Sequence, residues 1–218
     1  MKKLIIISLA IISLFAICCK PTKTDPTPTT PPVVVIKMDS VISIKNIQLY
    51  NQGLDTLKNN GYKFYNITNR KYSNNVNSAI ELAFVYNSFN KSANKHLLGS
   101  ARAITIKLNH GISNSNNTKV DFYTVKNDGS TLLYDTLLNS KGFDKIFTTT
   151  YMQKANVGGE SDAIQSDGFG WDVNQLIGFQ LANGKRGIIK TINKPSGSID
   201  SQNNLILGNI QFDIKLEK

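Results

Sequence analysis

The last strand-like stretch of the chain, Ile210-Gln-Phe-Asp-Ile-Lys-Leu-Glu217, is the clearest indication of the fold. Four apolar residues occupy every second position (Ile210, Phe212, Ile214 and Leu216), and polar or charged residues fill the positions between them. A period of two is typical of a β-strand that buries one face. The stretch therefore predicts an antiparallel strand with its apolar face on a core.

The same spacing recurs upstream. Apolar residues alternate from Ile80 to Tyr86 and again from Ile104 to Leu108, so both segments are expected to be half-buried strands. Further strands are expected over residues 33–37, 41–49 and 62–67, the last one following Asn60-Gly61, whereas residues 194–203 are expected to form a polar loop. The pattern predicts an all-β protein with little helix, an antiparallel two-sheet sandwich-like domain, with a related α+β fold as the alternative.

Two Gly-containing dipeptides predict tight hairpins. Asn183-Gly184 separates the apolar runs Ile177–Ala182 and Lys185–Ile192, and Asn-Gly suits the two positive-φ positions of a type I′ turn. A second hairpin is expected at Asp128-Gly129, between residues 119–126 and 131–135.

The alternation fades between Asp135 and Gln175, where five glycines fall in a segment with one short helix expected near Phe143–Phe147. A long irregular segment in a compact domain is often functional. The alternative is a surface crossover between two sheets, and the sequence leaves both interpretations open.

The N-terminus predicts export. Lys2 and Lys3 precede an apolar run from Leu4 to Ile17, and the only two cysteines of the chain, Cys18 and Cys19, follow directly. This order is typical of a bacterial lipoprotein signal in which one thiol receives the lipid. Cleavage before Cys19 leaves Cys18 as the residue preceding the cut, whereas cleavage before Cys18 leaves the larger Ile17 there. A small residue is usual at this position, so Cys19 is the preferred anchor and Cys18 is the alternative.

The predicted organisation is a signal and anchor over residues 1–19, a Pro/Thr-rich linker over 20–32 and a β ectodomain over 33–218. The linker lacks apolar residues to bury and should be extended. We therefore expect an outer-membrane lipoprotein of the cell envelope, facing either the periplasm or the surface. A thiol-free ectodomain has neither disulfides nor zinc–cysteine sites.

The charge pattern argues against nucleic acid as a partner. The chain has a net charge of +10, which falls to +8 without Lys2 and Lys3, and its lysines are scattered singly rather than in a stripe. The membrane, through the lipid, is the one partner the sequence predicts. A protein, a glycan or a small molecule is left as the second partner.

Enzymatic activity is not expected. No Gly-x-Ser-x-Gly, His-Glu-x-x-His, P-loop or Rossmann motif occurs. A carboxylate pair for glycoside chemistry would have to come from the acidic residues of the irregular segment. These are Glu160, Asp162, Asp167 and Asp172.

Four residues are candidates for a ligand-binding site. Trp171 in a Gly-rich loop, with Tyr151, could provide an aromatic platform for a sugar or a porphyrin, or could cap the end of the sandwich. Met152 offers a thioether ligand, and His110 offers an imidazole that could share a metal or haem with His96 from a neighbouring loop. Their fourteen-residue separation fits no zinc spacing, so ordinary packing and exposed loop histidines are the alternatives, and no cofactor is predicted.

Three features together carry a resemblance: Cys18-Cys19-Lys20, the pair Tyr62–Ile67 and Ile80–Phe84, and the run Gly178–Lys190 leading to Ile210–Asp213. The chain resembles the envelope lipoproteins of Bacteroidetes that carry a β-rich ectodomain and, more remotely, the HmuY-type haem-binding lipoproteins of that phylum. The haem-binding type usually has Trp-Asp where this chain has Ile80-Glu81. No histidine or methionine of this chain matches the axial ligands of that type, so the resemblance does not carry haem binding over to it. From the whole sequence we expect a non-enzymatic binding or structural module, with small-ligand binding (haem or glycan) as the alternative.

Overall fold

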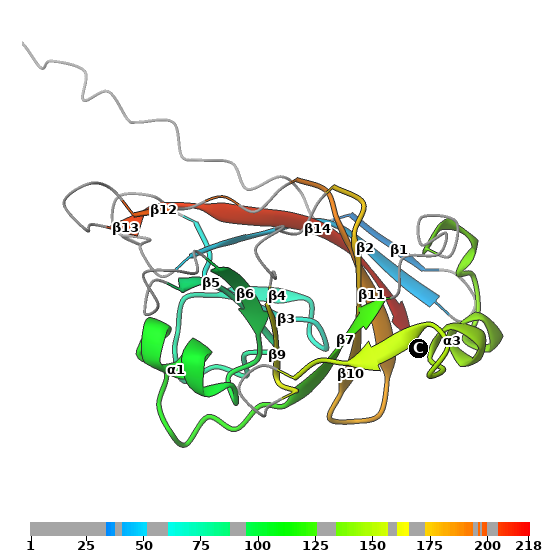
Figure 1. Ribbon diagram of the computed structural model, residues 1–218, viewed down its shortest axis with the longest axis horizontal. Coiled ribbons are helices and arrows are strands. Elements are labelled where there is room, and N and C mark those ends of the chain that lie inside the picture. The colour runs from blue at the N-terminus through cyan, green and yellow to red at the C-terminus, as the bar shows by residue number, and fades with distance from the viewer. Residues whose placement is uncertain are drawn as a thin grey trace, which may run out of the picture.

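The computed structural model describes residues 34–37, 41–51, 61–87, 95–125, 134–156, 161–165, 173–193, 196, 198–199 and 205–218. Strands predominate in these residues and form two main antiparallel sheets, so the predicted all-β, sandwich-like fold is confirmed (Figure 1). The signal, the anchor and the linker lie outside the described residues.

The larger sheet has seven strands in the order β1-β2-β14-β11-β10-β7-β8. Its strands are β1 (Val34–Lys37), β2 (Val41–Tyr50), β14 (Asn209–Glu217), β11 (Arg186–Thr191), β10 (Leu176–Leu181), β7 (Val120–Val125) and β8 (Met152–Lys154). The predicted C-terminal strand is β14, which lies near the middle of the sheet and pairs with β2 and β11.

The second sheet has five strands in the order β4-β3-β5-β6-β9. Its strands are β4 (Lys71–Ser73), β3 (Phe64–Asn66), β5 (Leu82–Asn87), β6 (Lys95–Gly99) and β9 (Ala163–Gln165). A separate two-stranded ribbon joins β12 (Ser198–Ile199) to β13 (Leu205–Ile206), so part of the polar loop predicted over 194–203 is a strand.

The main core lies between the two sheets. Ile44, Phe179 and Phe212 of the larger sheet pack in one buried cluster with Phe84 and Leu98 of the smaller sheet. Their burial agrees with the period-two spacing in the sequence, because alternate side chains of a strand point to the same face of the sheet.

The segment Ile104–Leu108, predicted as a strand, is part of helix α1 (Ile104–His110) instead. Only Ile106 of its three alternating apolar residues is buried, whereas Ile104 is 59% exposed and Leu108 is 70% exposed. The alternation was therefore misleading: it reflects two apolar residues on the outer face of a helix rather than one buried face of a strand. The helix ends at Gly111, which adopts a left-handed conformation (φ 63°) that suits glycine.

The hairpin at Asn183-Gly184 joins β10 to β11 as predicted, but its turn type differs from the prediction. Gly184 has φ 86°, whereas Asn183 does not have a positive φ. Gly184 donates its backbone N–H to Leu181, and Leu181 donates to the carbonyl of Lys185. The connection is thus a three-residue loop, a type I turn followed by a left-handed glycine, rather than a type I′ turn.

The second predicted hairpin is wrong in the part that the structure describes. The neighbours of β7 are β10 and β8, and residues 134–136 form a helical turn instead of a strand. The dipeptide Asp128-Gly129 itself lies outside the described residues.

The irregular segment between Asp135 and Gln175 connects the two sheets. It contains α3 (Ser140–Ile146), close to the predicted helix, then β8 of the larger sheet and β9 of the smaller sheet. In its described residues the segment therefore crosses between the sheets, as one of the two interpretations expects, and some of the same residues line the cleft described below.

Candidate ligand-binding cleft

A cleft of about 400 Å³ lies on the outer face of the seven-stranded sheet, beside α3; we call it the α3 cleft. Its lining comes from β7, β8, β10 and β11 and from the residues that follow α3. These residues are Tyr123, Phe147, Thr148, Thr149, Met152, Lys154, Gln180 and Arg186. Gln180 reaches this face because Phe179 and Leu181, its neighbours on β10, point into the core between the sheets.

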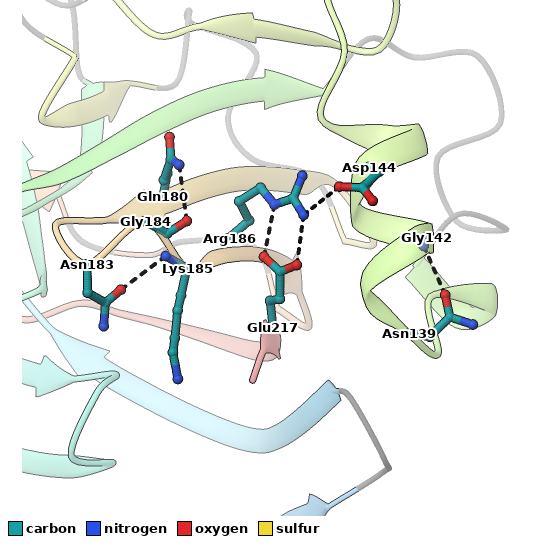
Figure 2. A network of polar contacts seen from close by, with 9 residues as sticks. All are labelled: Asn139, Gly142, Asp144, Gln180, Asn183, Gly184, Lys185, Arg186 and Glu217. Atoms are coloured by element: carbon teal, nitrogen blue, oxygen red, sulfur yellow. Dashed lines mark hydrogen bonds and ion pairs between the residues drawn. The ribbon is translucent and has the colours of Figure 1, made fainter.

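Arg186 forms the shortest side-chain polar contacts of the cleft (Figure 2). Its Nε donates to Glu217 Oε2 at 2.9 Å, and one terminal nitrogen donates to Glu217 Oε1 at 2.7 Å and to Asp144 Oδ1 at 2.8 Å. The hydrogen bonds from Arg186 hold the pKa of Glu217 below its ordinary value. Because Asp144 belongs to α3 and Glu217 ends β14, this guanidinium ties the helix to the sheet.

Apolar contacts hold α3 in the same place. Phe143 and Ile146 are buried against the outer face of the sheet, and the guanidinium of Arg186 lies 6.0 Å from the centre of the Phe143 ring. At the helix start, the side chain of Asn139 accepts a hydrogen bond from the backbone N–H of Gly142 at 3.0 Å (Figure 2). The wall of the cleft is therefore fixed at both ends of the helix.

Two aromatic rings form one wall. The rings of Tyr123 and Phe147 meet edge to face, with 5.6 Å between their centres and 75° between their planes. The Tyr123 hydroxyl donates to Gln180 Oε1 at 3.4 Å, and Gln180 Nε2 donates to the carbonyl of Gly184 at 3.1 Å. Burial raises the pKa of Tyr123, so its hydroxyl stays protonated and acts as a donor at neutral pH.

The cations near the cleft have acidic partners. Lys154 Nζ lies 3.4 Å from Asp121 Oδ1, and Lys119 Nζ lies 3.2 Å from Asp121 Oδ2. Burial raises the pKa of Asp121, but hydrogen bonds from Ser161 and Lys119 outweigh it and bring the pKa below its ordinary value. With Arg186 paired as described above, the charges around the cleft are largely balanced.

Met152, a predicted site residue, lines the cleft but is only 6% exposed. Its sulfur packs over Gly178: a Cβ atom added to this glycine would lie 2.6 Å from Met152 Sδ. In this structure the thioether therefore serves as the floor of the cleft.

Tyr151 precedes Met152 and has intermediate exposure, and its backbone N–H donates to the carbonyl of Thr148 at 3.1 Å. It is adjacent to the α3 cleft without lining it. Trp171 lies outside the described residues, so the aromatic platform predicted for Trp171 and Tyr151 stays a prediction.

His110 and His96 do not share a site. His96 lies on β6 rather than in a loop, and its ring stacks on Phe84, which belongs to the core between the sheets. His110 ends α1, and its ring contacts Phe64 in the separate cluster beneath that helix. The two rings lie on opposite faces of the smaller sheet, so the expectation of two histidines in neighbouring loops is wrong.

The imidazole of His110 forms a hydrogen bond to the backbone of β5. Its Nε2 lies 2.9 Å from the backbone carbonyl of Phe84, and burial lowers its pKa to about 4. The neutral ring therefore donates to that carbonyl at pH 7.

Of the four acidic residues singled out in the irregular segment, the structure describes one, Asp162. Asp162 is 4% exposed and pairs with Arg102, whose Nε lies 3.2 Å from Asp162 Oδ2. Glu160, Asp167 and Asp172 lie outside the described residues. Among the residues that the structure describes, no group of three His, Cys, Asp or Glu side chains is arranged to hold a metal.

The sequence did not single out Tyr123, Gln180 or Arg186. Each lies at an outward position of an alternating strand, where a polar side chain normally faces solvent. Two signals were available: the helix predicted near Phe143, since a helix beside a sheet needs a face to cover, and the predicted hairpin, which pairs Gln180 with Arg186.

The fold and the cleft thus define a two-sheet β protein with a polar, aromatic-walled cleft outside its core. No family model matches the chain, and comparisons with curated protein sequences and with solved structures found no significant match. None of the helices in the described residues has the length and apolar character needed to cross a bilayer.

Proposed function

We propose that the chain is a lipid-anchored, non-enzymatic protein of the cell envelope that binds a neutral carbohydrate in the α3 cleft. The observation that supports this proposal is the lining of the cleft. It combines an aromatic wall with a side-chain amide and hydroxyl groups, in a volume of about 400 Å³ that suits a small ligand.

Each part of that lining suits a sugar. The rings of Tyr123 and Phe147 offer apolar surface to the C–H face of a pyranose. Gln180, Thr148 and Thr149 offer the donors and acceptors that hydroxyl groups require. A neutral ligand is favoured because Arg186 and Lys154 already have carboxylate partners.

The lining residues also favour binding over catalysis. Lys154 and Arg186 are the titratable cations of the lining, Tyr123 is its phenol, and the eight lining residues include no carboxylate or histidine to act as a general acid or base. Hydrolysis of a glycosidic bond requires a pair of carboxyl groups flanking the bond.

Haem is the competing ligand. The lining provides one axial ligand candidate, Met152, whose sulfur packs against Gly178. A porphyrin would have to displace this packing, whereas a sugar would not.

The anchor is proposed from the leader that ends at Cys18 and Cys19. Mass spectrometry of the membrane fraction should find a diacylglyceryl-modified mature chain that starts at Cys19, and Cys19→Ser should abolish it. A chain starting at Cys18 would move the anchor by one residue, and an unprocessed chain without lipid would contradict the proposal.

Binding is tested with residues 20–218 on an array of neutral and acidic oligosaccharides, with haemin titrated in parallel. We expect saturable binding to a neutral glycan, weakened roughly tenfold by Gln180→Ala and by Phe147→Ala. The matched control is Gln211→Ala, which removes the same side chain from β14. Equal binding by all three variants, or saturable binding of haemin alone, would contradict the proposal.

A further inference from the structure

Helix α1 exposes two of its three large aliphatic side chains and buries only the third. Ile106 is fully buried, whereas Ile104 and Leu108 are 59% and 70% exposed. Residues 104 and 108 are one turn apart and lie on the same side of the helix, roughly opposite Ile106 and His110. Two large aliphatic side chains therefore form an exposed ridge, the α1 ridge.

The helix cannot rotate to bury this ridge. Ile106 packs over Gly99 of β6, where an added Cβ would lie 2.7 Å from Ile106 Cγ1. His110 Nε2 holds the other end of the helix to the Phe84 carbonyl at 2.9 Å. The exposure of Ile104 and Leu108 is thus built into the packing of α1 on the sheet.

Cations flank the ridge. Arg102 precedes the helix and keeps 51% of its side chain exposed while paired with Asp162. Lys107 lies within the helix, next to Leu108, and contacts Asn117.

We infer that the α1 ridge is a contact surface for an anionic lipid membrane, with Ile104 and Leu108 entering the headgroup region and the flanking cations meeting lipid phosphates. Aliphatic side chains beside Lys and Arg are the combination that peripheral membrane segments use. Without Lys2 and Lys3 of the predicted signal the chain keeps a net charge of +8, which is opposite in sign to the charge of an anionic lipid surface.

A weak contact would suffice in a tethered protein. The inference goes beyond the proposed function and uses the proposed anchor only here: a linker of residues 20–32 would keep the domain within about 40 Å of the bilayer, at about 3.1 Å per residue. At that distance the effective lipid concentration is high. The ridge would then set the orientation of the domain on the membrane.

The test uses residues 20–218, which contain every described core residue, from Val41 to Leu216. This chain has no cysteine, so Leu108→Cys provides a single attachment site for an environment-sensitive dye. The matched control is Leu138→Cys, because Leu138 is 51% exposed and lies on another surface.

With vesicles of phosphatidylglycerol and phosphatidylethanolamine, we expect the dye at position 108, and not at 138, to shift to the blue. In flotation assays of the unlabelled protein, Ile104→Ser/Leu108→Ser should weaken vesicle binding roughly tenfold or more, and phosphatidylcholine vesicles or high salt should also weaken it. The control Leu138→Ser/Val173→Ser should bind as the parent does.

Three results would overturn the inference. They are equal vesicle binding by parent and ridge variant, no vesicle binding by the parent, and a blue shift that grows with protein concentration in the absence of lipid. The last result would assign the ridge to contact between copies of the chain. Because carbohydrate binding is measured without vesicles, failure of this test leaves the proposed function of the α3 cleft unaffected.

Discussion

The backbone N–H of Asn46 donates a 2.9 Å hydrogen bond to Oδ1 of Asp213, at the point where β2 bulges away from β14. Asn46 adopts a left-handed conformation (φ 62°), and the register shifts between Phe212 and Ile214. The extra residue changes which positions face the core, so Ile44 and Ile47 are both buried although three positions separate them.

This bulge predicts an asymmetric response to substitution. Asn46→Gly keeps both the conformation and the backbone donor, so we expect the free energy of unfolding to change by a few tenths of a kcal/mol, whereas Asn46→Ala should cost about 1 kcal/mol. Asp213→Ala removes the acceptor and should cost about 1–2 kcal/mol. Urea denaturation measures all three, and an equal loss for the Gly and Ala variants would contradict the account.

The ion pair between Arg186 and Glu217 should be strongly coupled. Their side chains are only 20% and 16% exposed, whereas that of Asp144 is 68% exposed. In a double-mutant cycle of Arg186→Met and Glu217→Gln we expect a coupling energy of about 2 kcal/mol.

Asp144→Asn serves as the control for that cycle and should cost no more than about 0.5 kcal/mol. A coupling energy near zero between Arg186 and Glu217 would mean that this contact does not hold α3 on the sheet.

His110 makes stability depend on pH. Burial lowers its pKa from 6.5 to about 4 in the folded state, so the unfolded chain takes up the proton first as the pH falls. The free energy of unfolding should therefore decrease as the pH falls from about 6.5 toward 4, with a loss of about 2 kcal/mol between pH 7.5 and pH 5.0.

The variant His110→Gln keeps a donor for the Phe84 carbonyl but cannot titrate. Urea denaturation at the two pH values should show most of the pH dependence removed in this variant. An unchanged dependence would assign the effect to other groups.

Gly187 should tolerate no side chain. The ring of Phe179, its cross-strand partner, lies across it, and an added Cβ would be 2.1 Å from Phe179 Cζ. We expect Gly187→Ala to cost about 3 kcal/mol, against about 1 kcal/mol for Gly184→Ala, where the positive φ is the only obstacle.

Phe179→Leu removes the ring that meets the added methyl group. Combining it with Gly187→Ala should therefore cost less than the two single losses together. Strict additivity, measured by thermal or urea denaturation, would contradict the contact.

The strands were predictable from sequence wherever one face of the strand is buried and the other is exposed to solvent. Ile210–Glu217 and Val41–Leu49 are of this kind, and both are strands. The period-two rule failed at Ile104–Leu108 because exposed aliphatic residues imitated a buried face. The rule also predicted a half-buried strand from Ile80 to Tyr86, whereas every residue of this stretch is buried. Both faces of β5 are covered, because α1 packs on the outer side of that sheet.

The α3 cleft was less predictable. Met152 was singled out by its chemistry and does line the cleft. The predicted hairpin at Asn183-Gly184 places Gln180 opposite Arg186, but Tyr123 joins them only because β7 pairs with β10, a strand far along the chain. No local pattern encodes that pairing.

Carbohydrate binding in the α3 cleft is tested most directly by a two-dimensional ¹H–¹⁵N NMR titration of residues 20–218 with the neutral oligosaccharide that binds best on the array. We expect saturable shifts concentrated at the backbone amides of Tyr123, Phe147 and Gln180 and at the side-chain amide of Gln180. Shifts confined to other surfaces, or no shifts at millimolar ligand, would contradict the proposal.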